Sequence, residues 1–148
     1  MNGLRTILLA EDNAKDVELT LAALEEHNLA NEVVVVGDGA EALDYLYCRG
    51  RFKLRTRANP AVVLLDLKMP KVDGLEVLRT IKEDEQLKTI PVVMLTSSHE
   101  EVELLGNHDL GVNASVVKPV NFHQLTAAVS QLGGFWAIIN GASARASK

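Results

Sequence analysis

The sequence predicts an α/β protein built on one parallel sheet of five strands with covering helices. Short apolar runs alternate along the chain with segments of helical period, a pattern typical of repeated strand-helix units. The runs are apolar throughout, as in strands that are buried on both faces. At 148 residues and 47% hydrophobic content, the chain fits a single domain. We expect this domain in residues 1–140 and a disordered small polar tail in 141–148.

The first unit pairs the apolar run 4–10 with an amphipathic helix. Asn13 can cap this helix, because its side chain can accept a hydrogen bond from the first helical turn. Three apolar residues then recur at the spacing of one helix face. They are Val17, Leu21 and Leu24.

The second and third units follow the same plan. Residues 32–36 form a strand, and the turn 37–39 leads into a helix. The next strand, 61–65, ends at Asp66, and a loop at 67–74 delays the following helix because it contains a proline and a glycine. The residues expected to face the core from the two helices are Ala42, Leu43, Leu46 and Tyr47, then Leu75, Leu78 and Ile81.

The fourth and fifth units complete the sheet. The strand 91–95 ends at Thr96, and the polar segment 96–101 is expected to form a loop and a helix cap. The strand 114–117 ends at Lys118, and a last helix begins near Asn121. The apolar residues of the two helices are Val102, Leu104 and Leu105, then Phe122, Leu125, Val129 and Leu132.

Charge and composition exclude several classes of function. The formal net charge of −5 argues against general binding of nucleic acids or anionic membranes, which need a positive field. No stretch approaches the roughly 18 apolar residues of a membrane helix, and no signal-peptide pattern is visible, so we expect a cytoplasmic protein. The single cysteine, Cys48, excludes an internal disulfide and is expected to be a buried structural thiol within a helix.

Chemically reactive side chains follow four of the five predicted strands. Glu11 and Asp12 follow the first, Asp66 the third, Thr96 the fourth and Lys118 the fifth. Each of these residues alone would more often be a helix cap or a solvated charge. Because the carboxyl ends of parallel strands meet at one edge of the sheet, where ligands bind in open α/β folds, the group as a whole predicts a site.

The residue types indicate a metal ion and a phosphoryl group. Clustered carboxylates repel one another and need a cation, and Mg²⁺ prefers oxygen ligands. Asp12, Asp66 and one backbone carbonyl would suffice beside water, with Glu11 acting directly or through water. Asp66 could then attack a phosphoryl group in line and become an acyl phosphate. The groups available to hold the phosphoryl oxygens are the Thr96 hydroxyl, the Ser97 backbone N–H and the Lys118 ammonium.

These residues stand in motifs that resemble those of the receiver domains of two-component response regulators. The resemblance covers roughly residues 4–133 and rests on the segments 8–12, 64–70, 73–74, 95–97 and 117–119. It implies a flavodoxin-like, doubly wound sheet in the order 2-1-3-4-5 with helices on both faces. It further implies a phosphoprotein in which Asp66 accepts phosphate from a sensor histidine kinase or a histidine phosphotransfer protein.

The resemblance also implies particular roles at the site. Mg²⁺ would be held by Asp12, Asp66 and the Lys68 carbonyl, with Glu11 beside it. Thr96 would move towards the phosphoryl group, and the peptide bond between Lys118 and Pro119 would be cis.

Two positions depart from or refine this pattern. Receivers commonly carry an aromatic residue where this chain has Ser115, so the usual coupling of the threonine to an aromatic side chain is in doubt and output is expected through another surface. Lys68 stands two residues after the acceptor, where its side chain borders the phosphoryl group. We hypothesise that Lys68 shields the acyl phosphate from hydrolysis.

Two segments lie outside the predicted site. Arg49, Arg51, Lys53, Arg55 and Arg57 alternate along a connection expected to be extended, which favours a solvated loop over a docking patch. The apolar segment 135–139 either folds back on its own core or covers a second subunit, so its Phe135 and Trp136 are candidate homodimer contacts. Both segments resemble a subgroup of single-domain receivers partnered with bacterial phytochrome kinases.

Three functions are compatible with these groups. A phosphate-accepting signalling module is favoured, with a changed protein-binding surface as its output, because only a short tail follows the receiver-like region. A magnesium-dependent phosphohydrolase of the haloacid-dehalogenase type would place a second acid two residues after the nucleophile, where this chain has Lys68. A binding-only pseudo-receiver normally loses one or more of the acids, all of which are present. The sequence thus predicts a phosphoacceptor and not an enzyme that turns over free substrate.

Overall fold

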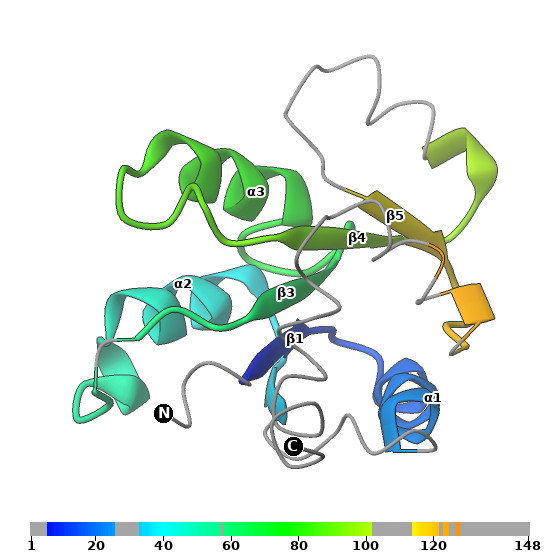
Figure 1. The fold of residues 1–148 in the computed structure, drawn as a ribbon, viewed down its shortest axis with the longest axis horizontal. Coiled ribbons are helices and arrows are strands. Elements are labelled where there is room, and N and C mark those ends of the chain that lie inside the picture. Colours follow the sequence, from blue (N-terminus) through cyan, green and yellow to red (C-terminus); the bar gives the residue numbers. More distant parts are fainter. Residues whose placement is uncertain are drawn as a thin grey trace, which may run out of the picture.

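The computed structural model describes residues 6–25, 33–56, 58–101, 114–121, 123, 124 and 127. Its strands form one five-stranded sheet in the order β2-β1-β3-β4-β5, and every pairing is parallel (Figure 1). The α/β class and the strand order are therefore confirmed. The strands are β1 (Ile7–Ala10), β2 (Val33–Val36), β3 (Val62–Asp66), β4 (Val92–Thr96) and β5 (Ala114–Val117).

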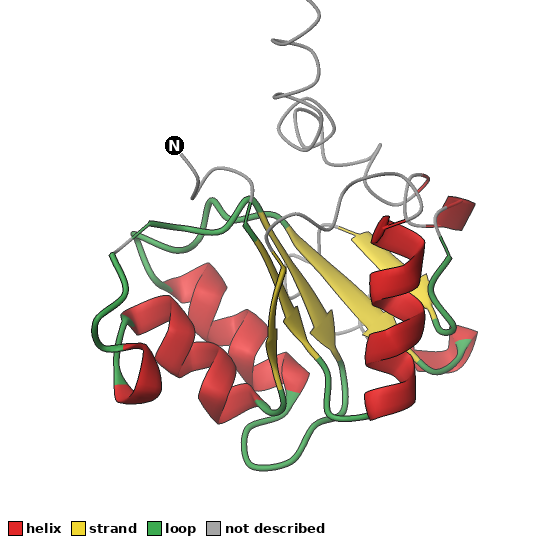
Figure 2. Ribbon diagram, turned by 90° about the horizontal axis from the view of Figure 1, so that it is seen from below, coloured by secondary structure: helices red, strands yellow, loops and turns green. Residues whose placement is uncertain are grey.

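Helices cover both faces of the sheet, as predicted. Figure 2 shows α1 on one face and α2 and α3 on the other. Successive strand residues alternate between these faces, so that Leu8 and Ala10 join the cluster under α2 and α3 while Ile7 and Leu9 join the cluster under α1. The helices are α1 (Ala14–Glu25), α2 (Gly39–Tyr47) and α3 (Gly74–Glu83), with a short 3₁₀ helix, η2 (Gly50–Phe52), after α2.

A side-chain cap begins each of α1, α2 and α3. The predicted cap Asn13 accepts a hydrogen bond from the Asp16 N–H at 2.9 Å. Asp38 and Asp73 cap α2 and α3 in the same way, with acceptor distances of 2.8 and 3.0 Å. Such caps satisfy backbone N–H groups that have no partner within the helix, and they fix the residue at which each helix begins after the preceding strand.

The basic segment after α2 differs from the prediction. It contains η2 instead of an extended strand-like connection, and its side chains bind protein groups. Arg49 and Arg51 pair with Asp44 and Glu41 of α2 at 2.9 and 2.6 Å. Arg55 stacks over the Tyr45 ring and donates to the Tyr45 carbonyl at 2.7 Å. Arg49 and Arg51 are 58% and 59% exposed, which agrees with the prediction of a solvated segment, whereas Arg55 is half-buried against Tyr45. Arg57 lies outside the described residues.

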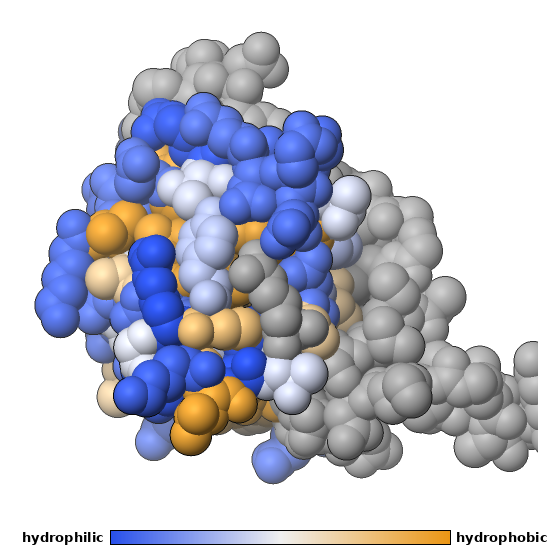
Figure 3. All heavy atoms as spheres, turned by 90° about the vertical axis from the view of Figure 1, so that its left-hand side faces the viewer, coloured by the Kyte–Doolittle hydropathy of each residue, from blue (hydrophilic) through white to orange (hydrophobic). Residues whose placement is uncertain are grey.

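The face formed by α2 and η2 is mixed in polarity. In Figure 3, which views the left-hand side of Figure 1, hydrophilic residues surround small hydrophobic areas.

Cys48 was expected to be buried within a helix, but it is only half-buried and stands at the end of α2 with a φ of 55°. The helix ends there because Cys48 adopts the left-handed conformation typical of helix ends.

Several predictions fall on residues outside the described part of the chain. These are the apolar residues of the helices expected after Glu101 and Asn121, the candidate dimer contacts Phe135 and Trp136, and the tail 141–148. Among the described residues, no helix is both long and apolar enough to cross a membrane.

Gly74 sets the shape of the loop between β3 and α3. Its N–H donates to the Leu67 carbonyl at 2.8 Å, which folds the loop back onto the end of β3. A Cβ atom at this position would lie 2.2 Å from the Asp66 carbonyl oxygen and 2.8 Å from Leu67 Cα, both of which are backbone atoms. Only glycine fits without a shift of the segment that carries Asp66.

We predict that Gly74→Ala lowers the free energy of unfolding by about 3 kcal/mol, because backbone atoms must move to admit the methyl group. Urea unfolding followed by circular dichroism measures this change. Gly37→Ala is the matched control, since a Cβ atom there would meet only the end of the Glu41 side chain at 3.9 Å. Equal losses of stability in the two variants would contradict the account of Gly74.

Candidate functional site

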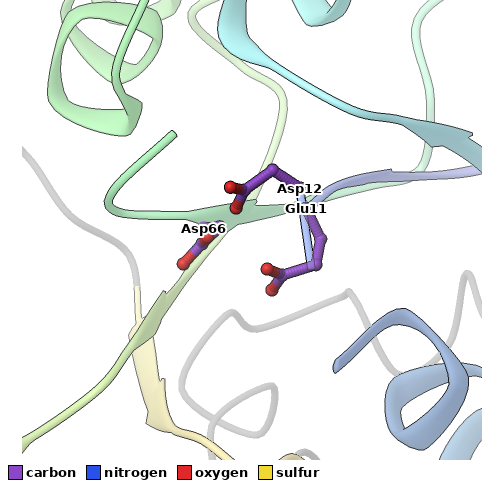
Figure 4. Close-up of side chains that lie close together, drawn as sticks. All are labelled: Glu11, Asp12 and Asp66. Atoms are coloured by element: carbon purple, nitrogen blue, oxygen red, sulfur yellow. The ribbon is translucent and has the colours of Figure 1, made fainter. Parts of the chain in front are cut away.

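The carboxyl ends of β1 and β3 bring three acids together. Glu11 and Asp12 directly follow β1, and Asp66 is the last residue of β3. Their carboxylate oxygens lie within 4.8 Å of one another, and Figure 4 shows the three side chains converging. Glu11 and Asp66 are buried, whereas Asp12 is exposed, so the cluster opens to solvent on the side of Asp12.

Lys118 holds this cluster from the end of β5. Its ammonium lies 3.1 Å from Asp66 Oδ1 and 3.3 Å from Glu11 Oε1. The Lys118 N–H donates to the Thr96 carbonyl at 2.7 Å, which fixes the lysine backbone beside β4. The following peptide bond, to Pro119, is cis, as the resemblance implied.

Asp16 is a further partner of Lys118 that the sequence analysis missed. Its Oδ2 lies 3.0 Å from the Lys118 ammonium. Asp16 is the third residue of α1, one turn after the cap Asn13. The sequence could have indicated this contact, because Asp16 is in the first turn of a helix that begins at the strand ends. Side chains of that turn point back towards the preceding loop.

Burial and charge shift the proton affinities of the central pair. Burial raises the pKa of Asp66 to about 7, and the charge of Glu11 adds to this, while the hydrogen bond from Lys118 acts in the opposite direction. Burial alone would lower the pKa of Lys118, but its hydrogen bonds to Asp16 and Asp66 and the charges of Asp66 and Glu11 outweigh burial and raise it. Lys118 therefore stays a cation, and without a metal ion one lysine leaves the charge of the acids incompletely offset.

The other groups predicted to donate hydrogen bonds to the phosphoryl oxygens have different partners in this structure. The buried Thr96 hydroxyl donates to the Val116 carbonyl of β5 at 3.3 Å. The Ser97 N–H donates to Glu101 Oε1 at 2.7 Å, and the Lys68 ammonium lies 3.3 Å from Glu101 Oε2. Of these four donors, Lys118 is the one that hydrogen-bonds Asp66 in the described part of the chain. The sequence predicts Glu101 only as part of a loop and helix cap, and it gives no sign that this side chain reaches Ser97 and Lys68.

The acidic cluster fits a hard divalent cation. All three side chains of the cluster offer carboxylate oxygens, which are the ligands that Mg²⁺, Mn²⁺ and Ca²⁺ prefer. The exposed Asp12 leaves room for the water molecules that such an ion keeps. Glu11 already accepts hydrogen bonds from Lys118 and from the Asn13 N–H, so Asp12 and Asp66 are better placed as direct ligands.

Comparison with known proteins agrees with this geometry. A family model described as the response regulator receiver domain matches residues 7–130. The chain belongs to this family. Response regulator Rcp1 of Synechocystis sp. (strain ATCC 27184 / PCC 6803 / Kazusa) is 37% identical to this receiver over 132 residues, which cover 89% of this chain and 88% of Rcp1.

Solved structures of related receivers share the fold. The bacteriophytochrome response regulator AtBRR is 62% identical with a TM-score of 0.86, over 90% of this chain and 95% of that one. The Mn²⁺-bound form of Rcp1 has a TM-score of 0.70 at 37% identity, over 88% and 93% of the two chains. The phosphorylated cyanobacterial phytochrome response regulator RcpA has a TM-score of 0.70 at 43% identity, over 88% and 92%.

We predict that Asp66→Asn stabilises the metal-free receiver at pH 8 by about 1–3 kcal/mol, since it removes a buried charge that Glu11 repels. The pKa of Asp66 rises from 3.8 to about 7 on folding, so the folded state binds more protons between these values. The free energy of unfolding of the wild type therefore falls as the pH rises through this window, and the difference from the variant disappears near pH 4.

Urea unfolding in EDTA at pH 4 and pH 8 tests this prediction. Asp12→Asn is the matched control, because it removes the same charge from an exposed position and should change stability less. A variant Asp66→Asn that is less stable than the wild type at pH 8 would show that pairing with Lys118 outweighs burial.

Proposed function

We propose that this receiver domain accepts a phosphoryl group on Asp66 from a phosphohistidine and signals through the resulting change of its protein-binding surface. The observation that carries the proposal is the position of the Asp66 carboxylate, at the carboxyl end of β3 and 3.1 Å from the Lys118 ammonium. Membership of the receiver family supports the same assignment. Lys68 stands where a phosphatase of the aspartate-nucleophile class would carry an acid, which favours a phosphoacceptor over turnover of a free substrate.

In the proposed reaction, a carboxylate oxygen of Asp66 attacks phosphorus opposite the histidine nitrogen. The bond between oxygen and phosphorus forms while the bond between phosphorus and nitrogen breaks, and its electron pair stays on the imidazole. The product is an acyl phosphate on Asp66 and a free histidine on the donor. Lys118 is already placed to pair with the new phosphoryl oxygens, because it contacts Asp66 before the reaction.

A divalent cation belongs to this proposal. Asp12, Asp66 and the Lys68 carbonyl would hold Mg²⁺, with Glu11 beside it. The bound ion would offset the charge of the acids and neutralise charge on the phosphoryl oxygens. The solved Mn²⁺-bound form of Rcp1 supports a divalent ion in a receiver of this kind.

Phosphorylation is proposed to favour a second arrangement of the Thr96 side chain. To reach a phosphoryl group, its hydroxyl must leave the Val116 carbonyl that it contacts at 3.3 Å. Ser115 offers no aromatic ring to follow this movement, so the change is expected to reach the surface through the loops after β3 and β4. Such a switch selects between two existing conformations.

The proposed phosphate source is a sensor histidine kinase of the bacterial phytochrome type. The resemblance to AtBRR, a bacteriophytochrome response regulator, supports this partner. A histidine phosphotransfer protein would present the same phosphohistidine chemistry. Formation of a homodimer through Phe135 and Trp136 stays a prediction.

We predict that acetyl phosphate with Mg²⁺ labels the wild-type chain to at most one phosphate per molecule and does not label Asp66→Asn. Phosphate-affinity gel electrophoresis measures the labelled fraction. Omission of Mg²⁺ should reduce labelling strongly. Continuous release of phosphate with many turnovers would instead indicate an enzyme, and absence of labelling would indicate a pseudo-receiver.

We further predict that Lys68→Ala shortens the half-life of the acyl phosphate, because its ammonium would no longer pair with the phosphoryl oxygens and exclude water. The loss of one exposed charge pair is expected to change the half-life by about two- to fivefold. Decay after removal of the donor measures it, with the exposed Lys88→Ala as the control. An unchanged or longer half-life in Lys68→Ala would end the shielding hypothesis.

A further inference from the structure

Glu101 is a buried acid that belongs neither to the metal cluster nor to the phosphoacceptor. It lies in the helical turn that follows β4, and its side chain is only 11% exposed. Its two carboxylate oxygens have different partners: Oε1 accepts from the Ser97 N–H at 2.7 Å, and Oε2 lies 3.3 Å from the Lys68 ammonium. Glu101 thereby links the loop after β4 to the loop after β3, which directly follows Asp66.

The two partners of Glu101 are the donors that an Asp66 phosphoryl group would need. A carboxylate and a phosphoryl group both present anionic oxygens to N–H donors, so they compete for the same hydrogen bonds. Glu101 and a phosphoryl group would also repel each other. The Ser97 N–H and Lys68 can therefore bind either the Glu101 carboxylate or a phosphoryl group on Asp66, but not both.

We propose that Glu101 is a positioning residue that occupies the Ser97 N–H and Lys68 in the resting receiver and yields both to the phosphoryl group on Asp66. This inference rests on the proposed function of Asp66. Exchange of the two donors releases the Glu101 carboxylate, and with it the turn 98–101. Glu101 thus opposes the phosphorylated state and couples it to the backbone after β4.

A purely structural role for Glu101 leads to a different expectation. The Glu101 N–H donates to Ser98 Oγ at 3.3 Å, and an acid in the first turn of a helix often binds an N–H at its start. Glutamine at position 101 keeps an acceptor for the Ser97 N–H but loses the charge that pairs with Lys68, whereas alanine loses both. If Glu101 only caps the helix, Glu101→Gln should behave like the wild type. Glu101→Ala should then be less stable, and its acyl phosphate should last no longer than that of the wild type.

The test compares Glu101→Gln and Glu101→Ala with the wild type, with acetyl phosphate and Mg²⁺ as the phosphate source. Competition predicts that the acyl phosphate of Glu101→Gln lasts about two- to fivefold longer, the effect of one charge pair released for the phosphoryl group. The half-life in Glu101→Ala should be at least as long, because the Ser97 N–H is also released. The half-life is measured after acetyl phosphate has been removed. A change of charge at position 101 can therefore not act on it by attracting or repelling this anion.

Glu100→Gln is the matched control, since it removes the same charge from an exposed position in the same turn. It should leave the half-life unchanged. A double-mutant cycle adds a second readout: Lys68→Ala should shorten the half-life by a larger factor in the Glu101→Gln background than in the wild type, because Lys68 is then free of its competitor.

The possible failures are distinguishable. A wild-type chain that accepts no phosphate overturns the proposed function itself. A labelled wild type whose half-life is matched by both Glu101 variants leaves the proposed function standing and overturns the role of Glu101. A shorter half-life in Glu101→Ala with no change in Glu101→Gln assigns the residue to helix capping and also overturns the proposal.

Discussion

The contact between Lys118 and the buried acids is the interaction on which the site depends. Glu11 and Asp66 are removed from water at the sheet edge, and burial together with the charge of Glu11 disfavours the charged form of Asp66. Lys118 offsets part of this cost with one ammonium that contacts both acids and Asp16. Loss of Lys118 would leave the buried acids without this cation and is expected to be strongly destabilising, so the acids depend on the lysine. The remaining excess of negative charge favours a cation at this edge.

The ends of the strands, the starts of the helices and one glycine place these groups. Parallel strands end at one edge, side-chain caps begin α1 and α3 beside it, and Gly74 allows the loop after Asp66 to return against its own backbone. The same geometry keeps Thr96, Ser97 and Lys68 close to the edge but bonded to other acceptors. The resting structure thus combines a fixed centre, formed by Asp66 and Lys118, with donors that must change partners.

Much of this arrangement could be predicted from the sequence, and the exceptions have physical reasons. Continuous apolar runs predicted β1, β3, β4 and β5. The acids that follow these runs could be placed together because strand ends in a parallel sheet converge. Contacts of Asp16 and Glu101 depend on where a side chain in the first turn of a helix points, which a linear pattern does not encode. The alternation of arginines after α2 suggested an extended chain, but Asp44, Glu41 and the Tyr45 carbonyl bind those arginines and stabilise a turn.

Identification of the modified residue tests the central claim most directly. Acyl phosphates can be reduced with borohydride, which converts a phosphorylated aspartate into homoserine, and tandem mass spectrometry of the digested chain then locates the change. After treatment with acetyl phosphate and Mg²⁺, the account predicts homoserine at position 66 alone. Reduction of Asp12 or Glu11 in place of Asp66, or a labelled chain with no reduced acid, would contradict it.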